Sequence, residues 1–386
     1  MVLSPAMADP AFLENPFPFY EMGRQMSPMM MGSSGMWMSF NWDECNEILK
    51  DHTTWPSGFG APGDESGGLS MLSVNPPKHT RLRGLVSQAF TPRMVEQMEP
   101  RFREIAAELL DPIIGNGQCD IVEALTYPLP VIVIAEILGV DPAHRAAFKR
   151  WSDSFVGGNP DANYRESAGG VFEEMREYFE RMCDERRKNP REDLISGLVQ
   201  AEIDGEKLSF NELFQMLVLL LVAGNETTTN LIGNALLEFM DHPDQLALVE
   251  EDMSLLPSAI EEVLRFNSPV QATVRRASRD VEFRGKEVKA GQAMTVFLGA
   301  ANRDPKVFEN PGTFDVRRTP NRHLAFGMGI HFCLGAPLAR LEAKIALEEL
   351  LKRAKNFRRT ETGPIKRQPM FILRGATELP LAFDAR

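Results

Sequence analysis

The stretch FGMGIHFCLGAPLAR, residues 326–340, places one cysteine among three glycines and a histidine. Three interpretations compete for Cys333. A lone cysteine is most often a small buried hydrophobic residue. A nucleophile would need a base, and His331 lacks an obvious carboxylate to orient it. A thiolate that binds a metal in a flat macrocycle would need backbone donors, an adjacent helix N-terminus and small neighbours. The third interpretation fits best, because a helix is predicted after Pro337. The small neighbours are Gly327, Gly329 and Gly335.

A second group of reactive side chains lies inside the apolar stretch LSFNELFQMLVLLLVAGNETTTNLIGNALLEFM, residues 208–240. Ser209 followed by Glu212 has the spacing of a capping box, and the apolar pattern predicts a core helix. Midway the helix carries Gly224, Glu226 and three threonines. These residues allow two interpretations: a kink where threonines bond to helix carbonyls, or a distorted helix that exposes an acid and a hydroxyl to a buried cavity. The residues alone leave both open.

The elements that must position these side chains are mostly helices. Apolar residues three and four apart predict helices over 92–114, 142–156, 171–189 and 341–356, besides 208–240. Loops or helix stops are expected at 115–120 and 139–142. Strands are predicted at 36–41, 281–299, with Gly285 at a hairpin turn, and 371–384. We therefore expect a mainly α fold with small β-sheets (α+β), forming one domain over 1–386, with 1–14 as a loosely ordered N-terminal segment.

Composition restricts the class of protein. The chain has 386 residues, 43% hydrophobic and 25% charged, with a net charge of −12. This charge argues against non-specific nucleic-acid binding. No apolar run approaches the roughly 20 residues that span a bilayer, and the N-terminus lacks the pattern of a signal peptide, so no membrane anchor and a cytoplasmic location are expected. The four scattered cysteines form no CxxC pair, which disfavours zinc ribbons and covalently attached haem.

The 326–340 stretch resembles the haem-binding loop of the cytochrome P450 family, F-G-x-G-x-H/R-x-C-x-G-x-x-L-A-R, at every fixed position. Other stretches resemble family motifs in the same order. They are NPPKHTRLRGLVSQAF (75–90), with Asn75 where many relatives have aspartate, AGNETT (223–228), EEVLR (261–265), VRRASRD (274–280) and the meander ANRDPKVFENPGTFDVRR. The resemblance covers nearly the whole chain and is closest to the soluble prokaryotic branch. It implies the P450 fold, with haem b between a long distal helix and the proximal helix after the cysteine loop.

The resemblance also implies roles for individual residues. Cys333 would ligate the iron, Thr227 would form a hydrogen bond beside the oxygen-binding position, and Glu226 would relay protons. Glu262, Arg265 and, most plausibly from the FDVRR stretch, Arg318 would form a structural triad. The haem would be bound by His79, Arg83, Ala223, Gly224, Arg275, Phe326, Gly327, His331, Cys333 and Gly335, of which His79, Arg83, Arg275 and His331 would hold the propionates.

By the same analogy the chain is a monooxygenase that inserts one oxygen atom from O2 into a hydrophobic organic substrate by hydroxylation or epoxidation. The analogy places the substrate near the loop from Trp55 to Leu72, residues 155–175 and the residues Leu219, Val222, Val270, Thr273, Met370 and Phe371. Electrons are expected from a separate ferredoxin and its reductase, or a flavodoxin-type donor. Candidate docking cations are Arg340, Lys344 and Arg101. The alternatives are a peroxide-driven haem-thiolate oxidase and a haem-based sensor.

Overall fold

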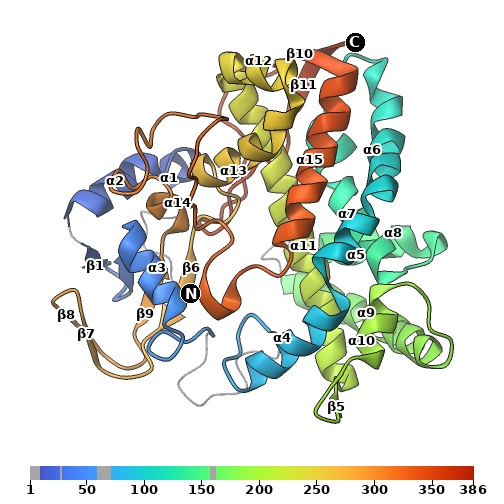
Figure 1. Cartoon of the computed structure of the whole chain (residues 1–386), viewed down its shortest axis with the longest axis horizontal. Coiled ribbons are helices and arrows are strands. Elements are labelled where there is room, and N and C mark those ends of the chain that lie inside the picture. Colours follow the sequence, from blue (N-terminus) through green and yellow to red (C-terminus); the bar gives the residue numbers. More distant parts are fainter. Residues whose placement is uncertain (1–8, 27, 59–70, 157–161) are drawn as a thin grey trace.

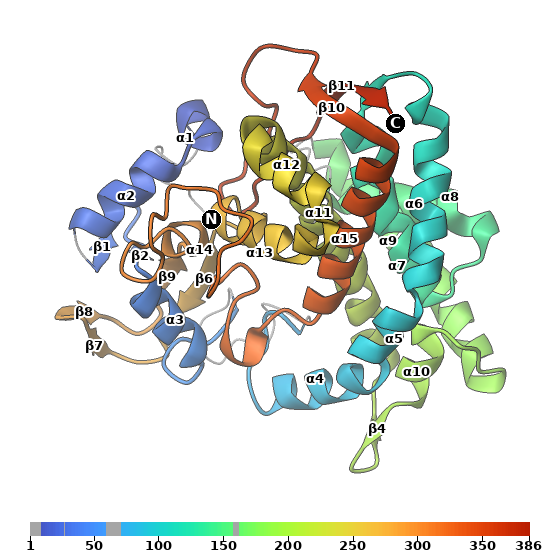
Figure 2. The ribbon, with the colours of Figure 1, turned by 45° about the horizontal axis from the view of Figure 1, so that its top comes forward.

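The computed structural model describes residues 9–26, 28–58, 71–156 and 162–386. Helices gather on one side of the molecule and most strands on the other, together with the N-terminal helices (Figures 1 and 2). The helices are α1 (Pro10–Glu14), α2 (Phe17–Met26), α3 (Trp42–Lys50), α4 (Lys78–Ala89), α5 (Pro92–Gln97), α6 (Glu99–Ile114), α7 (Pro128–Leu138), α8 (Arg145–Val156), α9 (Ala162–Lys188), α10 (Leu194–Gln200), α11 (Phe210–Asp241), α12 (Pro243–Glu251), α13 (Leu256–Phe266), α14 (Leu298–Ala301) and α15 (Ala336–Arg353).

The strands form small sheets. They are β1 (Met29–Met31), β2 (Trp37–Ser39), β3 (Gln118–Asp120), β4 (Glu202–Ile203), β5 (Glu206–Lys207), β6 (Thr273–Arg276), β7 (Val281–Phe283), β8 (Lys286–Val288), β9 (Ala293–Val296), β10 (Ala354–Arg359) and β11 (Pro380–Ala385). One sheet has the order β1-β2-β9-β6, with β2 and β9 parallel and the other pairs antiparallel. A second has the order β10-β11-β3, and β4-β5 and β7-β8 are hairpins. The mainly α fold with small sheets is confirmed.

The long helix α11 runs through the helical part of the molecule and packs against α7, α8, α13 and α15. The Ser209 hydroxyl accepts from the Glu212 N–H, and the Glu212 carboxylate accepts from the Ser209 N–H at 3.0 Å, which forms the expected capping box. Within the described residues α11 alone is long and apolar enough to cross a membrane, which the sequence analysis did not expect. Because 56% of that apolar window is buried and other helices surround it, α11 is a core helix.

Several element boundaries differ from the predictions. The predicted helix 92–114 breaks at Met98 into α5 and α6. The predicted loop 115–120 contains β3, which pairs with β11 from the far end of the chain, a partner that local sequence does not reveal. Of the strand signal at 371–384, only β11 forms a strand, from Pro380 onward. The β7–β8 hairpin turns at Gly285 (φ +72°) as predicted.

Where it is described, the N-terminal segment contains the short helix α1. Asp9 caps α1, its side chain accepting from the Ala11 N–H at 2.8 Å. Phe12 is buried against Phe19 and Tyr20, with ring centroids 5.3 and 6.2 Å away. Residues 9–14 are therefore packed onto the molecule by aromatic side chains, and residues 1–8 lie outside the described part.

Candidate active site

The cysteine loop, residues 326–335, lies just before α15. The Cys333 N–H donates to the Phe326 carbonyl at 2.9 Å, and the Cys333 sulfur accepts from the backbone N–H groups of Gly335 and Ala336. Burial raises the pKa of the Cys333 thiol, while these N–H donors and the nearby charges of Arg83 and Arg340 oppose the rise. Peptide N–H groups at a helix start favour a negative sulfur. The surroundings of Cys333 therefore suit a thiolate whose negative charge is neutralised by a bound metal cation.

The glycines of this loop differ in what an added side chain would meet. Gly327 (φ +69°) and Gly329 (φ +71°) adopt left-handed backbone conformations that other residues rarely adopt. A Cβ at Gly329 would lie 2.6 Å from the Leu49 carbonyl oxygen at the end of α3. Gly329 therefore allows the loop to approach the end of α3 closely. Gly335 alone borders the sulfur, where a Cβ would lie at an ordinary contact distance of 3.9 Å from Sγ.

Four side chains from separate elements gather beside this loop. His79 and Arg83 come from α4, Arg275 from β6, and His331 from the loop itself. The rings of His79 and His331 lie 4.3 Å apart, and the charges of Arg83 and Arg275 both lower the pKa of His331. Arg275 is 7% exposed and donates to the Thr273 hydroxyl and the Val274 carbonyl. Among the described residues neither arginine has an ion pair with a carboxylate. Within the part of the chain that the structure describes, the cluster is therefore positive and has no carboxylate counter-charge.

Hydrogen bonding and pKa values indicate what the cluster lacks. The Nε2 atoms of His79 and His331 are buried without a partner in the described structure. Burial, followed by the nearby cationic groups, lowers the pKa of His331 to about 3, and burial lowers that of Arg275 to about 10. His52, which the sequence analysis did not single out, also contributes to the lowered pKa of both histidines. An anionic group with several acceptors would satisfy these donors.

The surface of α11 is open around residues 223 and 224. A Cβ at Gly224 would meet no atom within 4 Å, and Ala223 is exposed. The helix continues through this point, and the Thr227 hydroxyl donates to the Ala223 carbonyl at 2.8 Å. The threonine bond to a helix carbonyl is therefore present without a break in α11. Haem b, with an iron for the thiolate and two carboxylates for the cationic cluster, fits these residues.

Glu226 directly precedes Thr227 on α11. It borders a cavity of about 130 Å³ that is lined by the following residues: Val122, Tyr127, Thr229, Asn230, Gln368, Leu373, Gly375, Ala376 and Thr377. Burial raises the pKa of Glu226 to about 7. A carboxyl group with this pKa is partly protonated near neutral pH, so it can both take up and release a proton. Glu226 is therefore a partly buried acid at the edge of a cavity.

The residues of the expected structural triad contact one another. Glu262 and Arg265 are fully buried and form a bidentate ion pair, with distances of 2.8 and 2.7 Å. The Arg318 Nε lies 3.1 Å from both Glu262 oxygens. Asn321, which the sequence analysis did not select, also donates to Glu262 at 3.1 Å. Every charge in the group is paired, which a buried charge requires.

The six proposed substrate-pocket residues are not all brought together. Leu219, Val222, Val270 and Thr273 are partly buried on α11 and near β6, and Met370 is exposed. Phe371 is 4% exposed and packs in an aromatic cluster 6.2 Å from the Phe297 ring centroid. Phe371 is therefore part of a hydrophobic core cluster, and its place in a substrate pocket stays a prediction. Much of the loop from Trp55 to Leu72 and of 155–175 lies outside the described side chains.

Comparisons with known proteins agree with this site. The family model Cytochrome P450 matches residues 149–377, more than half of the chain. The putative cytochrome P450 YjiB of Bacillus subtilis is 42% identical over 368 residues, covering 93% of this chain and 92% of that protein. The structure of CYP109Q5 from Chondromyces apiculatus has a TM-score of 0.90 at 42% identity, covering 98% of both chains. CYP109E1 from Bacillus megaterium in complex with corticosterone has a TM-score of 0.90 at 39% identity, covering 96% of this chain and 99% of that one.

These similarities extend over nearly the whole chain, at 93% coverage for the Bacillus subtilis protein and 98% for CYP109Q5. The relatives are bacterial proteins of the same fold and length. The chain therefore belongs to the cytochrome P450 family and is a haem-containing monooxygenase.

Proposed function

We propose that this monooxygenase inserts one oxygen atom from O2 into a hydrophobic organic substrate, by hydroxylation or epoxidation, with electrons delivered by separate proteins. The observation that carries the proposal is the neighbouring acid and alcohol of α11: Glu226 at its cavity and Thr227 beside the open face at Ala223. Reduction of O2 with insertion of one atom consumes two protons, and a buried site needs groups that deliver them. An oxidase that uses hydrogen peroxide does not need such delivery, because the peroxide molecule already carries both protons.

Cys333 would hold the haem iron, and His79, Arg83, Arg275 and His331 would hold the two carboxylates. When bound, haem supplies the iron centre at which O2 is activated, and a thiolate ligand favours O–O cleavage. Carboxylates among these side chains would supply the missing counter-charge and reach the two unpartnered Nε2 atoms. These residues would thereby fix the haem in orientation as well as in place.

Thr227 would position a proton-donating water. Its hydroxyl proton is directed to the Ala223 carbonyl, so its free lone pairs accept from a neighbouring donor. Glu226 would supply that water with protons from its own cavity, whose volume of about 130 Å³ has room for about four waters. The pKa of about 7 suits a group that is repeatedly protonated by solvent and deprotonated by the reaction.

We infer the substrate class from the apolar side chains of the predicted pocket. Leu219, Val222 and Val270 are partly buried and carry no charge, which favours a hydrophobic ligand. A solved relative at 39% identity holds corticosterone. A steroid or a terpenoid of similar size and polarity is therefore the first class to screen, by the low-to-high-spin shift of the haem.

The electron donor would be a ferredoxin with its reductase, or a flavodoxin-type protein. Of the three cations expected to dock it, Arg101 is held by Glu104, Glu108 and Glu136, and Arg340 by Glu261. The nearest carboxylate to Lys344 is Glu99, at 3.9 Å. Lys344 is therefore the strongest of the three candidates for contact with an acidic partner.

The test compares two oxidant systems on a substrate found by the spin-shift screen. One contains NADPH, a ferredoxin, its reductase and O2, and the other contains hydrogen peroxide alone. We expect the first to give product at least tenfold faster. Comparable or faster turnover with peroxide alone would favour the peroxide-driven oxidase instead, and no turnover with either would favour a sensor.

A further inference from the structure

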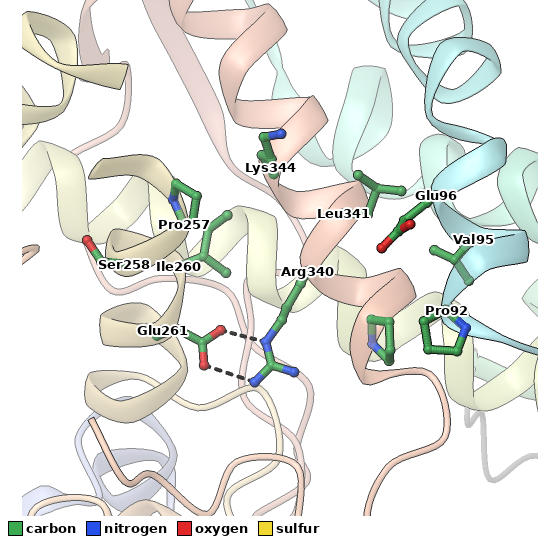
Figure 3. Close-up of a pocket in the computed structure, with 11 residues that line it drawn as sticks. Pro92, Val95, Glu96, Pro257, Ser258, Ile260, Glu261, Arg340, Leu341 and Lys344 are labelled. Atoms are coloured by element: carbon green, nitrogen blue, oxygen red, sulfur yellow. Dashed lines mark hydrogen bonds and ion pairs between the residues drawn. The ribbon is translucent and has the colours of Figure 1, made fainter. Parts of the chain in front are cut away.

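Glu261 immediately precedes the triad residue Glu262 but points elsewhere. Successive residues of an α-helix lie about 100° apart around its axis. Glu262 is turned into the core toward Arg265 and Arg318, whereas Glu261 faces α15 and meets Arg340 (Figure 3). The site described above gives Glu261 no task.

Glu261 binds two cationic or polar side chains at once. Its carboxylate accepts from Arg340 Nε at 2.6 Å and from Arg340 Nη2 at 2.9 Å. The His323 Nε2 lies 3.0 Å from Glu261 Oε2, and the His323 Nδ1 accepts from the Ala325 N–H at 3.2 Å. Because Nδ1 is an acceptor, the ring proton is on Nε2, which therefore donates to Glu261. The carboxylate thus holds three donors in fixed directions.

Both partners of Glu261 contact the same aromatic ring. The Arg340 guanidinium lies over the Phe326 ring, 4.5 Å from its centroid, and the His323 ring centroid is 6.1 Å from that of Phe326. Phe326 is the first residue of the cysteine loop, and its carbonyl accepts from the Cys333 N–H. A continuous set of contacts therefore joins Glu261 to the backbone of Cys333.

The burial of this group separates it from an ordinary surface ion pair. Side-chain exposure is 4% for His323, 29% for Glu261 and 38% for Arg340. Burial by itself would raise the pKa of Glu261, but the His323 and Arg340 donors bring it down to about 2. Exposed pairs contribute little because water competes for both charges. Here the buried His323 donor, the bidentate Arg340–Glu261 pair and the Arg340 guanidinium stacked on Phe326 stabilise one another.

We propose that Glu261 is a positioning residue for the cysteine loop: by holding Arg340 and His323 against Phe326, it fixes the loop from which Cys333 presents its sulfur. The inference rests on the proposed function, in which Cys333 is the iron ligand. It also assigns the Arg340 guanidinium to the cysteine loop and not to a docked electron donor.

The groove beside the Glu261–Arg340 pair contains a residue that serves as a matched control. Glu261 and Arg340 line a groove of about 410 Å³ between α5, α13 and α15, and Glu96 lines the same groove from α5 (Figure 3). Glu96→Gln removes the same charge from the same groove without touching Phe326. A general electrostatic effect on the haem would therefore be seen in both variants, and a positioning effect in Glu261→Gln alone.

The experiment measures haem-loaded Glu261→Gln, Arg340→Lys, their double variant and Glu96→Gln. The readouts are the rate at which the reduced, carbon-monoxide-bound protein loses its thiolate-type Soret band on warming, and the reduction potential of the haem. We expect Glu261→Gln to lose the band about tenfold faster, as a change of about 1.4 kcal/mol would produce. Arg340→Lys should behave alike, because lysine keeps the charge but loses the planar fork.

Two further results decide the proposal. The double variant should be no worse than the worse single variant, because both changes break one set of contacts. Both the rate and the potential of Glu96→Gln should stay near the wild-type values. The proposal is overturned if Glu261→Gln matches Glu96→Gln, or if the single effects add fully in the double variant. If Glu261→Gln does not load haem, wild-type behaviour of Arg340→Lys overturns it. Absence of the thiolate-type band in the wild-type protein would instead refute the proposed function.

Discussion

At the scale of single residues, Thr227 and Glu226 are neighbours with different surroundings. The Thr227 hydroxyl is fixed by the Ala223 carbonyl beside the open face of α11, whereas Glu226 is partly buried at the edge of a cavity. Their separation by one residue directs the two side chains to different sides of the helix. A water is therefore needed to connect the two side chains. Substitutions at the two positions should have different effects on the protein.

Thr227→Ala removes the hydroxyl that would accept a hydrogen bond from the proton-donating water. We expect product formed per NADPH to fall about tenfold, with hydrogen peroxide released in its place, while NADPH consumption continues. Thr227→Ser keeps the hydroxyl and should remain within about twofold of the wild type. The measurement is product and peroxide per NADPH, and unchanged coupling in Thr227→Ala would remove Thr227 from proton delivery.

Glu226→Gln should change the pH dependence of stability. The folded pKa of about 7 lies above the usual value of 4.5, so the folded state binds the extra proton between these pH values. The contribution of Glu226 to stability is therefore fully present below about pH 4.5 and is lost as the pH rises through about 7. The full shift corresponds to about 3 kcal/mol, and partial solvent access reduces the expected cost to about 1–2 kcal/mol.

Urea unfolding at pH 5 and pH 8 measures this cost. At pH 5 the variant and the wild type should have similar midpoints, because the wild-type carboxyl is largely neutral in the folded state. At pH 8 the variant should be more stable by about 1–2 kcal/mol. Equal stability at both pH values would mean that Glu226 is solvated like a surface residue.

At the scale of elements, adjacent glutamates on α13 connect that helix to two different parts of the chain. Glu262 binds Arg265 and Arg318, and Glu261 binds Arg340 of α15. The sequence predicted the first set because its spacing resembles a known motif. It gave no sign of the second, because the partners of Glu261 depend on how α13 packs against α15. Similarly, Gly329 was expected beside the sulfur, but its nearest contact is α3, from a distant part of the chain.

Glu262→Gln should destabilise the protein strongly. The change leaves Arg265 fully buried and Arg318 mostly buried without their carboxylate, which costs about 3–5 kcal/mol. The matched control is Glu250→Gln, which breaks the Glu250–Arg386 pair at the surface and should cost less than about 1 kcal/mol. Urea unfolding of both variants checks the difference. Similar small losses in the two would show that the buried group contributes no more than a surface pair.

At the scale of the whole molecule, the site is assembled from segments that are far apart in the sequence. The cationic cluster takes His79 and Arg83 from α4, Arg275 from β6 and His331 from the cysteine loop. The fold class, the core helix α11 and the residues of this cluster were predictable, since periodicity and motif spacing are local. The break at Met98, the pairing of β3 with β11 and the packing of Phe371 were not, because each depends on a long-range partner.

The central claim is that Cys333 is the iron ligand of a haem-thiolate monooxygenase, and the spectrum of the reduced, carbon-monoxide-bound protein tests it most directly. The wild-type protein should show the strongly red-shifted Soret band of thiolate ligation, and Cys333→Ser should lose it. Cys119→Ser, which changes another unpaired cysteine, should keep the band. A wild-type protein without the band, or a Cys333→Ser variant that retains it, would contradict the account.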